Sequence, residues 1–364
     1  MKRKMMSLIL SGACLLSLIG CGNSSADSAQ ASGASSAPKE ASSAPQEAEG
    51  STGAVSDAEE KTSEDVKVVI GATGLQEDQF TQVMINGYKD AAAELGIDII
   101  TSNSQHSAET ETEQINNMLE AGAQGIIIEC VNPDSSAAIA ETAKEAGAAV
   151  FACAITLNSD AVFASGVNDC YDLGKSTGEY AKEYFAEHFS TDETINVGII
   201  SYDGQDYTGS NDRITGFLDQ LSDYDINLVA RQEGEVADKA YTVATDILTK
   251  NPDIDVFFCA SENSVVGCVN AIEAAGNPNS TVVFGVDCSE QLVDMLKADA
   301  NILQGTTAQD PYTLGTYAVK TVYEYVVNGV EPAEKDFHAE CIALNKSDLD
   351  KVDQWLSDWN EHAK

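Results

Sequence analysis

From Val66 onward, short runs of β-branched and apolar residues alternate with longer amphipathic segments. The run at 66–73 predicts a buried strand, and 80–96 predicts a helix with one mainly apolar side that ends at Gly96. The alternation continues with strands expected at 97–102, 124–130 and 148–154 and helices at 108–122 and 136–147. Such repeated strand–helix units predict a parallel sheet with helices on both faces.

The same pattern then starts a second time. We expect strands at 194–202, 226–232, 255–261 and 281–287, and helices at 212–224, 237–252, 264–276 and 289–299. A further strand, a turn at Asp310–Pro311 and a long helix fill 301–329, and a last amphipathic helix fills 349–363. Its Trp355 and Trp359 are interpreted as core anchors.

The fold class that follows is α/β, with two doubly wound parallel-sheet lobes. In open parallel sheets, the loops at the carboxyl ends of the strands form the binding crevice. Two such lobes with these edges facing each other would enclose a small molecule, and closure about a hinge is the motion that this arrangement favours.

The first 21 residues have the layout of an export signal. Lys2, Arg3 and Lys4 precede an apolar segment, 5–19, that is too short to span a bilayer permanently. Its end, "LSLIGC", resembles the bacterial lipobox, and the resemblance implies cleavage after residue 20 and lipid on Cys21. A plain signal peptide with a small-residue cleavage site is the alternative.

Residues 21–65 are expected to form a tether that starts at the lipidated Cys21. Beyond the cysteine they are dominated by Ser, Ala, Gly, Glu, Gln and Pro and contain no aromatic residue. Such a chain buries too little surface to offset its ordering entropy, so we expect a disordered spacer that lifts the folded body off the membrane.

The charge excludes some classes of partner. The chain of 364 residues carries 20 Lys and Arg against 59 Asp and Glu, a formal net charge of −39. Nucleic-acid binding and electrostatic adhesion to anionic lipid both need dense basic residues, so neither is expected. We interpret the acidity as a contribution to solubility. No later segment is long and apolar enough to predict a transmembrane helix.

Nothing in the sequence indicates catalysis. The chain has no phosphate-binding loop of the Gly-Lys-Ser/Thr type, no His-Glu-x-x-His and no Gly-x-Ser-x-Gly, and its four histidines are dispersed. We therefore expect neither an enzyme, nor a cofactor, nor a metal site.

Seven cysteines remain beyond Cys21. They lack the close paired spacing of zinc sites and do not suggest a disulfide framework. Four of them follow strands and so fall near the expected crevice: Cys130, Cys153, Cys259 and Cys288. A thiol-lined site, a soft-metal site or disulfides are conceivable there, but small buried thiols are the simpler interpretation.

Residues 66–330 resemble the ribose- and galactose-type periplasmic sugar-binding proteins, which are relatives of the ligand-binding core of the lac repressor family. The similar stretches include "QINNMLEAGAQGIIIE", "DRITGFLDQL", "ILTKNPDIDVFFCASENSVVGCVNAIEAAG", "VVFGVD" and "TTAQDPYTLG", in the family's order. The resemblance implies the type I periplasmic binding protein fold, with lobes at 66–168 plus about 310–330 and at 169–309 plus about 331–364. It also implies binding without covalent chemistry.

The resemblance also implies a set of ligand-binding residues. Phe80 matches an aromatic residue that stacks on the sugar ring, and Asp78 matches an Asn that binds hydroxyls. The other implied ligand-binding residues lie in the second half of the chain: Asn211, Ser261, Glu262, Asp287 and Gln309. Arg213 matches a second, less direct Arg, and Asp169 falls in the first crossover between lobes.

Three usual contributors to the family's site are absent. Ala154–Ile155 stand where the family commonly has Asp-Arg, Thr81 replaces a second stacking aromatic, and the aromatic of the second lobe is missing near Ala237. Tyr202 and Tyr207 are candidates for a new aromatic wall. The local alternatives are that Asp287, Asn211 and Asp212 cap helices, that Phe80 packs locally, and that Gln309 is a turn residue.

The expected function is an extracytoplasmic solute-binding lipoprotein on the outer face of the cell membrane. It would capture a small polar ligand, a monosaccharide above all, and deliver it to an ABC import permease. The alternative is a receptor that presents its closed form to a sensor kinase or chemoreceptor.

Overall fold

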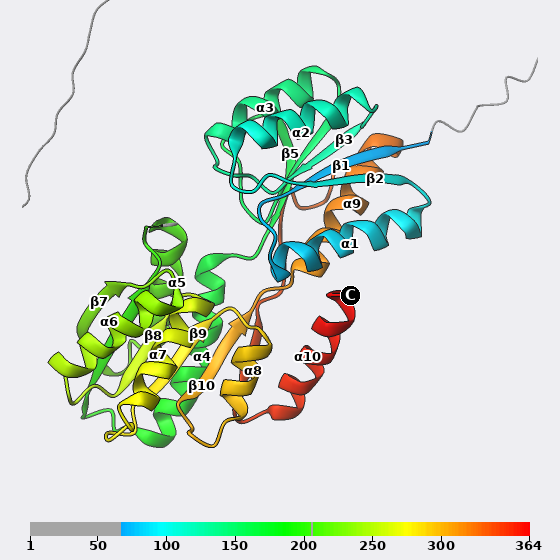
Figure 1. Ribbon diagram of the computed structural model, residues 1–364. Coiled ribbons are helices and arrows are strands. Elements are labelled where there is room, and N and C mark those ends of the chain that lie inside the picture. The colour runs from blue at the N-terminus through cyan, green and yellow to red at the C-terminus, as the bar shows by residue number, and fades with distance from the viewer. Residues whose placement is uncertain (1–66, 205–206) are drawn as a thin grey trace, which may run out of the picture. The chain divides into compact units, whose positions relative to one another are not determined.

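The computed structural model describes residues 67–204 and 207–364. The expected signal peptide, Cys21 and the tether lie outside these residues. Two six-stranded sheets organise the described chain, in the orders β11-β5-β4-β3-β1-β2 and β12-β10-β9-β8-β6-β7 (Figure 1). The predicted α/β fold with two parallel-sheet lobes is confirmed.

The first lobe contains the elements β1 (Val69–Gly74), α1 (Gln79–Leu95), β2 (Asp98–Asn103), α2 (Ala108–Glu120), β3 (Gly125–Ile128), α3 (Ser135–Glu145), β4 (Ala149–Cys153), β5 (Val162–Val167), α9 (Pro311–Asn328) and β11 (Asp336–His338). All strand pairs of this sheet are parallel. Helices α1 and α9 pack in one apolar cluster with strand residues, and α2 and α3 pack in another. The sheet is therefore covered on both faces, as parallel sheets require.

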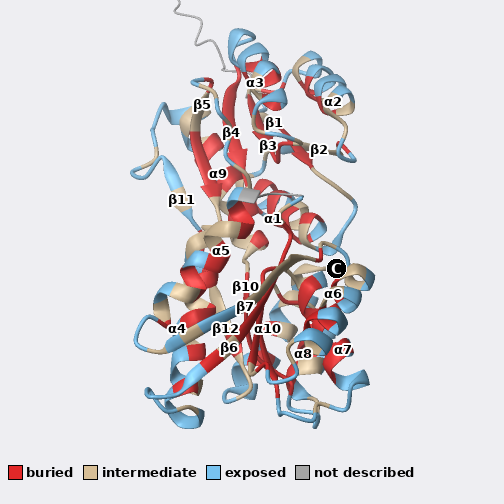
Figure 2. Ribbon diagram, turned by 90° about the vertical axis from the view of Figure 1, so that its left-hand side faces the viewer, coloured by how far each residue is buried: buried red, intermediate tan, exposed pale blue. Residues whose placement is uncertain are grey.

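The second lobe contains α4 (Cys170–His188), β6 (Thr194–Ser201), α5 (Tyr207–Gln220), β7 (Asp225–Glu233), α6 (Ala237–Lys250), β8 (Val256–Cys259), α7 (Glu262–Ala274), β9 (Val282–Val286), α8 (Glu290–Lys297), β10 (Leu303–Ala308), β12 (Ile342–Asn345) and α10 (Leu349–His362). Strand β12 is antiparallel to β10, and the other pairs are parallel. Figure 2 shows buried strands here, with helices α7 and α8 exposed on their outer sides.

The chain passes between the sheets three times, after β5, after β10 and after β11. The third passage was expected near residue 330, but it comes later. Strand β11 pairs with β5 in the first sheet, Asp336 beside Ser165, so residues 336–338 belong to the first lobe. Three residues carry too short a pattern to predict a strand.

Asn168 links all three passages. Its side-chain nitrogen donates to the carbonyl oxygens of Ala339 and Glu340, each at 3.3 Å, and its oxygen accepts from the Asp310 backbone nitrogen at 3.4 Å. The side chain is 7% exposed. One buried amide therefore joins three segments that are distant in sequence.

Helices α4 and α5 approach each other closely because glycines face the neighbouring backbone. A Cβ atom on Gly174 would overlap the carbonyl oxygen of Arg213, and one on Gly216 would overlap that of Tyr171. This contact fixes the position of α5 and, with it, the side chain of Arg213.

Candidate functional site

A cavity of about 520 Å³ is lined by residues that follow strands of both sheets. This is the edge where open parallel sheets bind ligands. Six of the seven expected ligand-binding residues line it: Asp78, Phe80, Ser261, Glu262, Asp287 and Gln309. The fold therefore brings together residues that are up to 231 positions apart in sequence (309 − 78).

Asp78 and Phe80 lie between β1 and the first turn of α1. Asp78 is the N-cap of α1, and its Oδ1 accepts from the Thr81 backbone nitrogen at 2.8 Å. The other oxygen, Oδ2, accepts from the side chain of Gln76 at 2.5 Å. The cap holds Phe80, which is half-buried, at the wall of the cavity.

Asp287 is the centre of the second lobe's polar network. Its Oδ2 lies 3.1 Å from Nη1 of Arg213, and its Oδ1 accepts from the Gln309 side chain at 2.8 Å. The Glu262 backbone nitrogen also donates to Oδ2, at 3.3 Å. Ser289, rather than Asp287, caps the following helix α8. Gln309 is not only a turn residue, because its side chain donates to Asp287.

The backbone of Asp287 has φ 74°, a left-handed conformation that is uncommon for a residue other than glycine. Ala154 has φ 65° at the matching place after β4 of the first lobe. Strained backbone of this kind persists where surrounding contacts hold it in place, often at binding sites. For Asp287, the contacts with Arg213 and Gln309 are such a restraint.

Arg213 is buried beneath the cavity. Its Nη1 also donates to the carbonyl oxygen of Ala260 at 2.9 Å, and its guanidinium lies 5.2 Å from the ring centre of Tyr202. Burial lowers the pKa of Arg213, but the charge of Asp287, together with other neighbours, raises this pKa by more than burial lowers it. The net shift is therefore upward. Arg213 stays charged and is neutralised by Asp287.

Asn211 is not among the residues that line the cavity. Helix α5 begins at Tyr207, earlier than expected, so Asn211 lies inside the helix and does not cap it. Its side-chain oxygen accepts from Nη1 of Arg231 at 3.1 Å. Tyr202 does line the cavity, whereas the side chain of Tyr207 lies outside the described part.

Glu129, which was not predicted from the sequence, follows β3 and lines the cavity with only 3% of its surface exposed. Its Oε2 accepts from the Leu75 backbone nitrogen at 2.8 Å and from Thr81 Oγ1 at 3.4 Å. Burial raises the pKa of Glu129 to about 7, and the nearby Asp78 adds to the rise. The sequence feature that could have indicated a role for Glu129 is its place as a single charged residue directly after the apolar strand "QGIII".

Trp359 also lines the cavity, although both tryptophans were expected to be core anchors. Trp355 does pack in the core of the second lobe, and Trp359 stacks on it with ring centres 5.2 Å apart. Farther along α10, the carbonyl oxygen of His362 accepts from Asn86 of α1 at 2.8 Å. Helix α10 thus contacts both lobes, and Trp359 lies between these two contacts in sequence.

The residues that depart from the expected site have other roles. Ala154 and Ile155 line the cavity without offering a charged group. Thr81 is buried and contacts Glu129, and Ala237 packs beside the apolar core of the second lobe. Cys170 and Cys288 line the cavity as well. All seven described cysteines are free, and five of them are buried.

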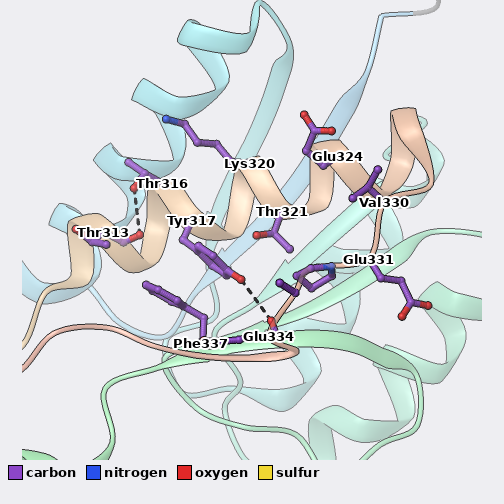
Figure 3. A pocket seen from close by; sticks show the side chains of 12 residues that line it. Thr313, Thr316, Tyr317, Lys320, Thr321, Glu324, Val330, Glu331, Glu334 and Phe337 are labelled. Atoms are coloured by element: carbon purple, nitrogen blue, oxygen red, sulfur yellow. Dashed lines mark hydrogen bonds between the residues drawn. The ribbon is translucent and has the colours of Figure 1, made fainter.

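A second cavity, of about 790 Å³, lies between α9 and the segment that follows it (Figure 3). Tyr317 stacks on Phe337 there, with ring centres 3.9 Å apart, and donates to the carbonyl oxygen of Glu334 at 3.5 Å. None of the expected ligand-binding residues lines it. This cavity is larger than the first, but the expected ligand-binding residues that follow strands line the first cavity.

Within residues 67–204 and 207–364, no three or more His, Cys, Asp or Glu residues are placed to hold a metal ion. No helix in that part of the chain has the length and apolar character needed to cross a membrane.

Comparison with protein families gives one match over most of the chain. Residues 69–329 match the family described as periplasmic binding protein domain. The ABC transporter periplasmic-binding protein YphF of Escherichia coli is 25% identical over 299 residues, which cover 80% of this chain and 89% of the relative. The D-apiose import binding protein of Actinobacillus succinogenes is 23% identical over 286 residues, covering 78% and 89%.

Solved structures share the fold. One is a periplasmic ribose ABC transporter structure from Conexibacter woesei, with a TM-score of 0.70 and 19% identity, covering 79% of this chain and 95% of that one. Another is the binding protein of the arabinose ABC transporter from Shewanella, bound to L-arabinofuranose. Its TM-score is 0.69 at 17% identity, with 81% and 98% covered.

Proposed function

The chain belongs to the periplasmic binding protein domain family, and from this premise we propose that it captures a monosaccharide or a close relative and delivers it to an ABC import permease. One observation carries the proposal: six residues chosen by their resemblance to sugar-binding positions line one cavity at the strand ends of both sheets. Relatives that are named as D-apiose and ribose import binding proteins support the proposal.

The lining has the composition that a sugar site needs. Phe80 offers a ring face, while Asp287 and Gln309 offer polar groups that are already held by hydrogen bonds. Sugars are bound by such an apolar face together with convergent, charge-assisted hydrogen bonds. The volume of about 520 Å³ is within the usual range for sites of small ligands.

Calorimetry with a panel of monosaccharides, nucleosides and polyols tests this function. We expect Phe80→Ala and Asp287→Ala to weaken binding at least about tenfold, or about 1.4 kcal/mol. Phe337→Ala is the matched control because it removes an aromatic ring from the second cavity. Equal affinity of wild type, Phe80→Ala and Asp287→Ala, or a loss confined to Phe337→Ala, would show that the ligand binds elsewhere.

The proposal includes export and a lipid anchor at Cys21, on the outer face of the membrane. The "LSLIGC" stretch supports it. Several acyl chains hold a protein at a bilayer because each buried methylene contributes about 0.8 kcal/mol. Cys21→Ser should move the protein from the membrane fraction to the soluble fraction after cell fractionation. Retention of this variant in the membrane fraction would contradict the anchor.

A further inference from the structure

Three carboxylates of the first cavity have no positive partner. Asp78, Glu129 and Glu262 all line it, and none of them forms an ion pair with a Lys, Arg or His of the described chain. The other two carboxylates in the lining are already paired, Asp287 with Arg213 and Glu235 with Lys239. Among the described residues that line the cavity, Arg213 is the only Arg or Lys, and its charge is already paired with Asp287.

Glu129 has a free acceptor atom although it is almost completely buried. Both of its hydrogen bonds, from Leu75 and Thr81, reach Oε2, and no described residue donates to Oε1. Oε1 is not among the fully buried side-chain atoms that lack a hydrogen-bond partner, so it is open to the cavity. Since Glu129 lines the cavity, a partner for this atom can come from a ligand.

Asp78 lies close enough to both Glu129 and Glu262 to repel their charges. The charge of Asp78 raises the pKa of both Glu129 and Glu262, and that of Asp287 also raises the pKa of Glu262, although burial is the larger cause in each case. Asp78 and Glu129 belong to the first lobe, whereas Glu262 begins α7 of the second. Negative potential is therefore concentrated in one cavity from both sides, which favours a cation.

The rings of the cavity suit the same ligand. Phe80 and Trp359 both line it, and an ammonium group is attracted to the face of such rings. The indole nitrogen of Trp359 is buried and has no hydrogen-bond partner among the described residues. It is a donor only, so it is suited to a ligand oxygen. The lining thus offers acceptors for a cation and at least one free donor for a hydroxyl.

We propose that the preferred ligand is a polyhydroxylated amine, an amino sugar or amino polyol, whose protonated amine binds among Asp78, Glu129 and Glu262. This inference rests on the proposed function and narrows its ligand class. A metal ion would be another way to neutralise the carboxylates, but no three of the described acidic, His or Cys residues are arranged to hold one.

Matched ligand pairs test the inference by calorimetry on the mature protein. The pairs are D-glucosamine with D-glucose, and D-galactosamine with D-galactose, and N-acetyl-D-glucosamine is the uncharged derivative. We expect an amino sugar to bind at least about tenfold tighter than its neutral partner and than its acetylated form. Neutral sugars that bind as tightly as the amines would overturn the charge preference and leave the proposed function intact. Binding of neither series would overturn both.

Two variants locate the effect. Glu129→Gln keeps the shape of the side chain and removes its charge, so the preference for the amine should fall about tenfold or more while affinity for the neutral partner changes less. Asp78→Asn is a second test that keeps an N-cap residue on α1. Glu235→Gln is the control because Lys239 already neutralises this carboxylate. An unchanged preference in both Glu129→Gln and Asp78→Asn would contradict the inference.

Discussion

The clearest test of the buried carboxylate is the dependence of stability on pH. Burial, the main cause, raises the pKa of Glu129 from 4.5 to about 7 in the folded protein. The titratable groups around it are Asp78, Tyr88, Cys130 and Cys153, which share electrostatic contacts with it. No cation of the described chain pairs with Glu129, and the hydrogen bonds from Leu75 and Thr81 offset only part of the cost of its charge.

The direction of the change in stability with pH follows from the difference in proton binding between the folded and unfolded states. Because the folded protein holds this proton more tightly than the unfolded chain, the stabilisation is complete below pH 4.5 and is lost as the pH rises through 7. Each pKa unit corresponds to about 1.36 kcal/mol, so the full loss is about 3 kcal/mol. About 2.5 kcal/mol of it falls between pH 5 and pH 8.

Glu129→Gln removes this titration and keeps an oxygen that can accept from Leu75. The free energy of unfolding is measured by urea denaturation at pH 5 and pH 8. The value for the variant minus the value for wild type should be about 2.5 kcal/mol larger at pH 8 than at pH 5. Glu109→Gln, on the exposed side of α2, corrects for the loss of one formal charge. A difference between Glu129→Gln and wild type that is the same at both pH values would refute the reasoning.

Three other substitutions test the framework around the site, each by urea denaturation. Gly174→Ala should lower the free energy of unfolding by about 2 kcal/mol, because its Cβ would overlap the backbone of Arg213. Gly147→Ala is the control, because a Cβ atom there would meet no neighbouring atom, and φ 90° should cost only about 1 kcal/mol. Equal losses of stability in the two variants would argue against the close contact of α4 and α5. Ala154→Gly should raise the free energy of unfolding by up to about 1 kcal/mol, because glycine adopts φ 65° without strain. A lower free energy of unfolding would contradict backbone strain at this position. Asn168→Ala should cost about 2 kcal/mol because it breaks three hydrogen bonds among the passages between the lobes, and an unchanged midpoint would show that they contribute little.

Periodicity predicted most of the long elements because their pattern is local, but it did not predict the 19-residue helix α4 (Cys170–His188). The helix expected at 80–96 is α1, and its expected stop, Gly96, adopts φ 68° as its C-cap. Strands β5, β11 and β12 were not foreseen. Strand β5 is interrupted by small residues, and the other two contain only three and four residues, so their pairing depends on distant strands.

The same distinction applies to the candidate site. The strand-end rule and the family resemblance together predicted that Asp287 and Phe80 lie at the crevice, and both line the cavity, because a position after a strand can be recognised from sequence. Trp359 reaches the cavity only because α10 packs against the second lobe and contacts the first. Asn211 does not line the cavity and lies inside helix α5, which begins earlier than its apolar pattern suggests.

The two lobes contribute to the cavity from matching positions, but their charges are balanced differently. After β9, the left-handed Asp287 is paired with the buried Arg213 of its own lobe. After β4, the left-handed Ala154 has no polar group, and the neighbouring strand end at β3 presents Glu129 without a cation. The second lobe thus contains a complete ion pair, Asp287 with Arg213, whereas in the first lobe no described cation is paired with Glu129. A ligand amine beside Glu129 would supply there what Arg213 supplies to Asp287, and its binding would remove the cost that makes the free protein less stable at high pH.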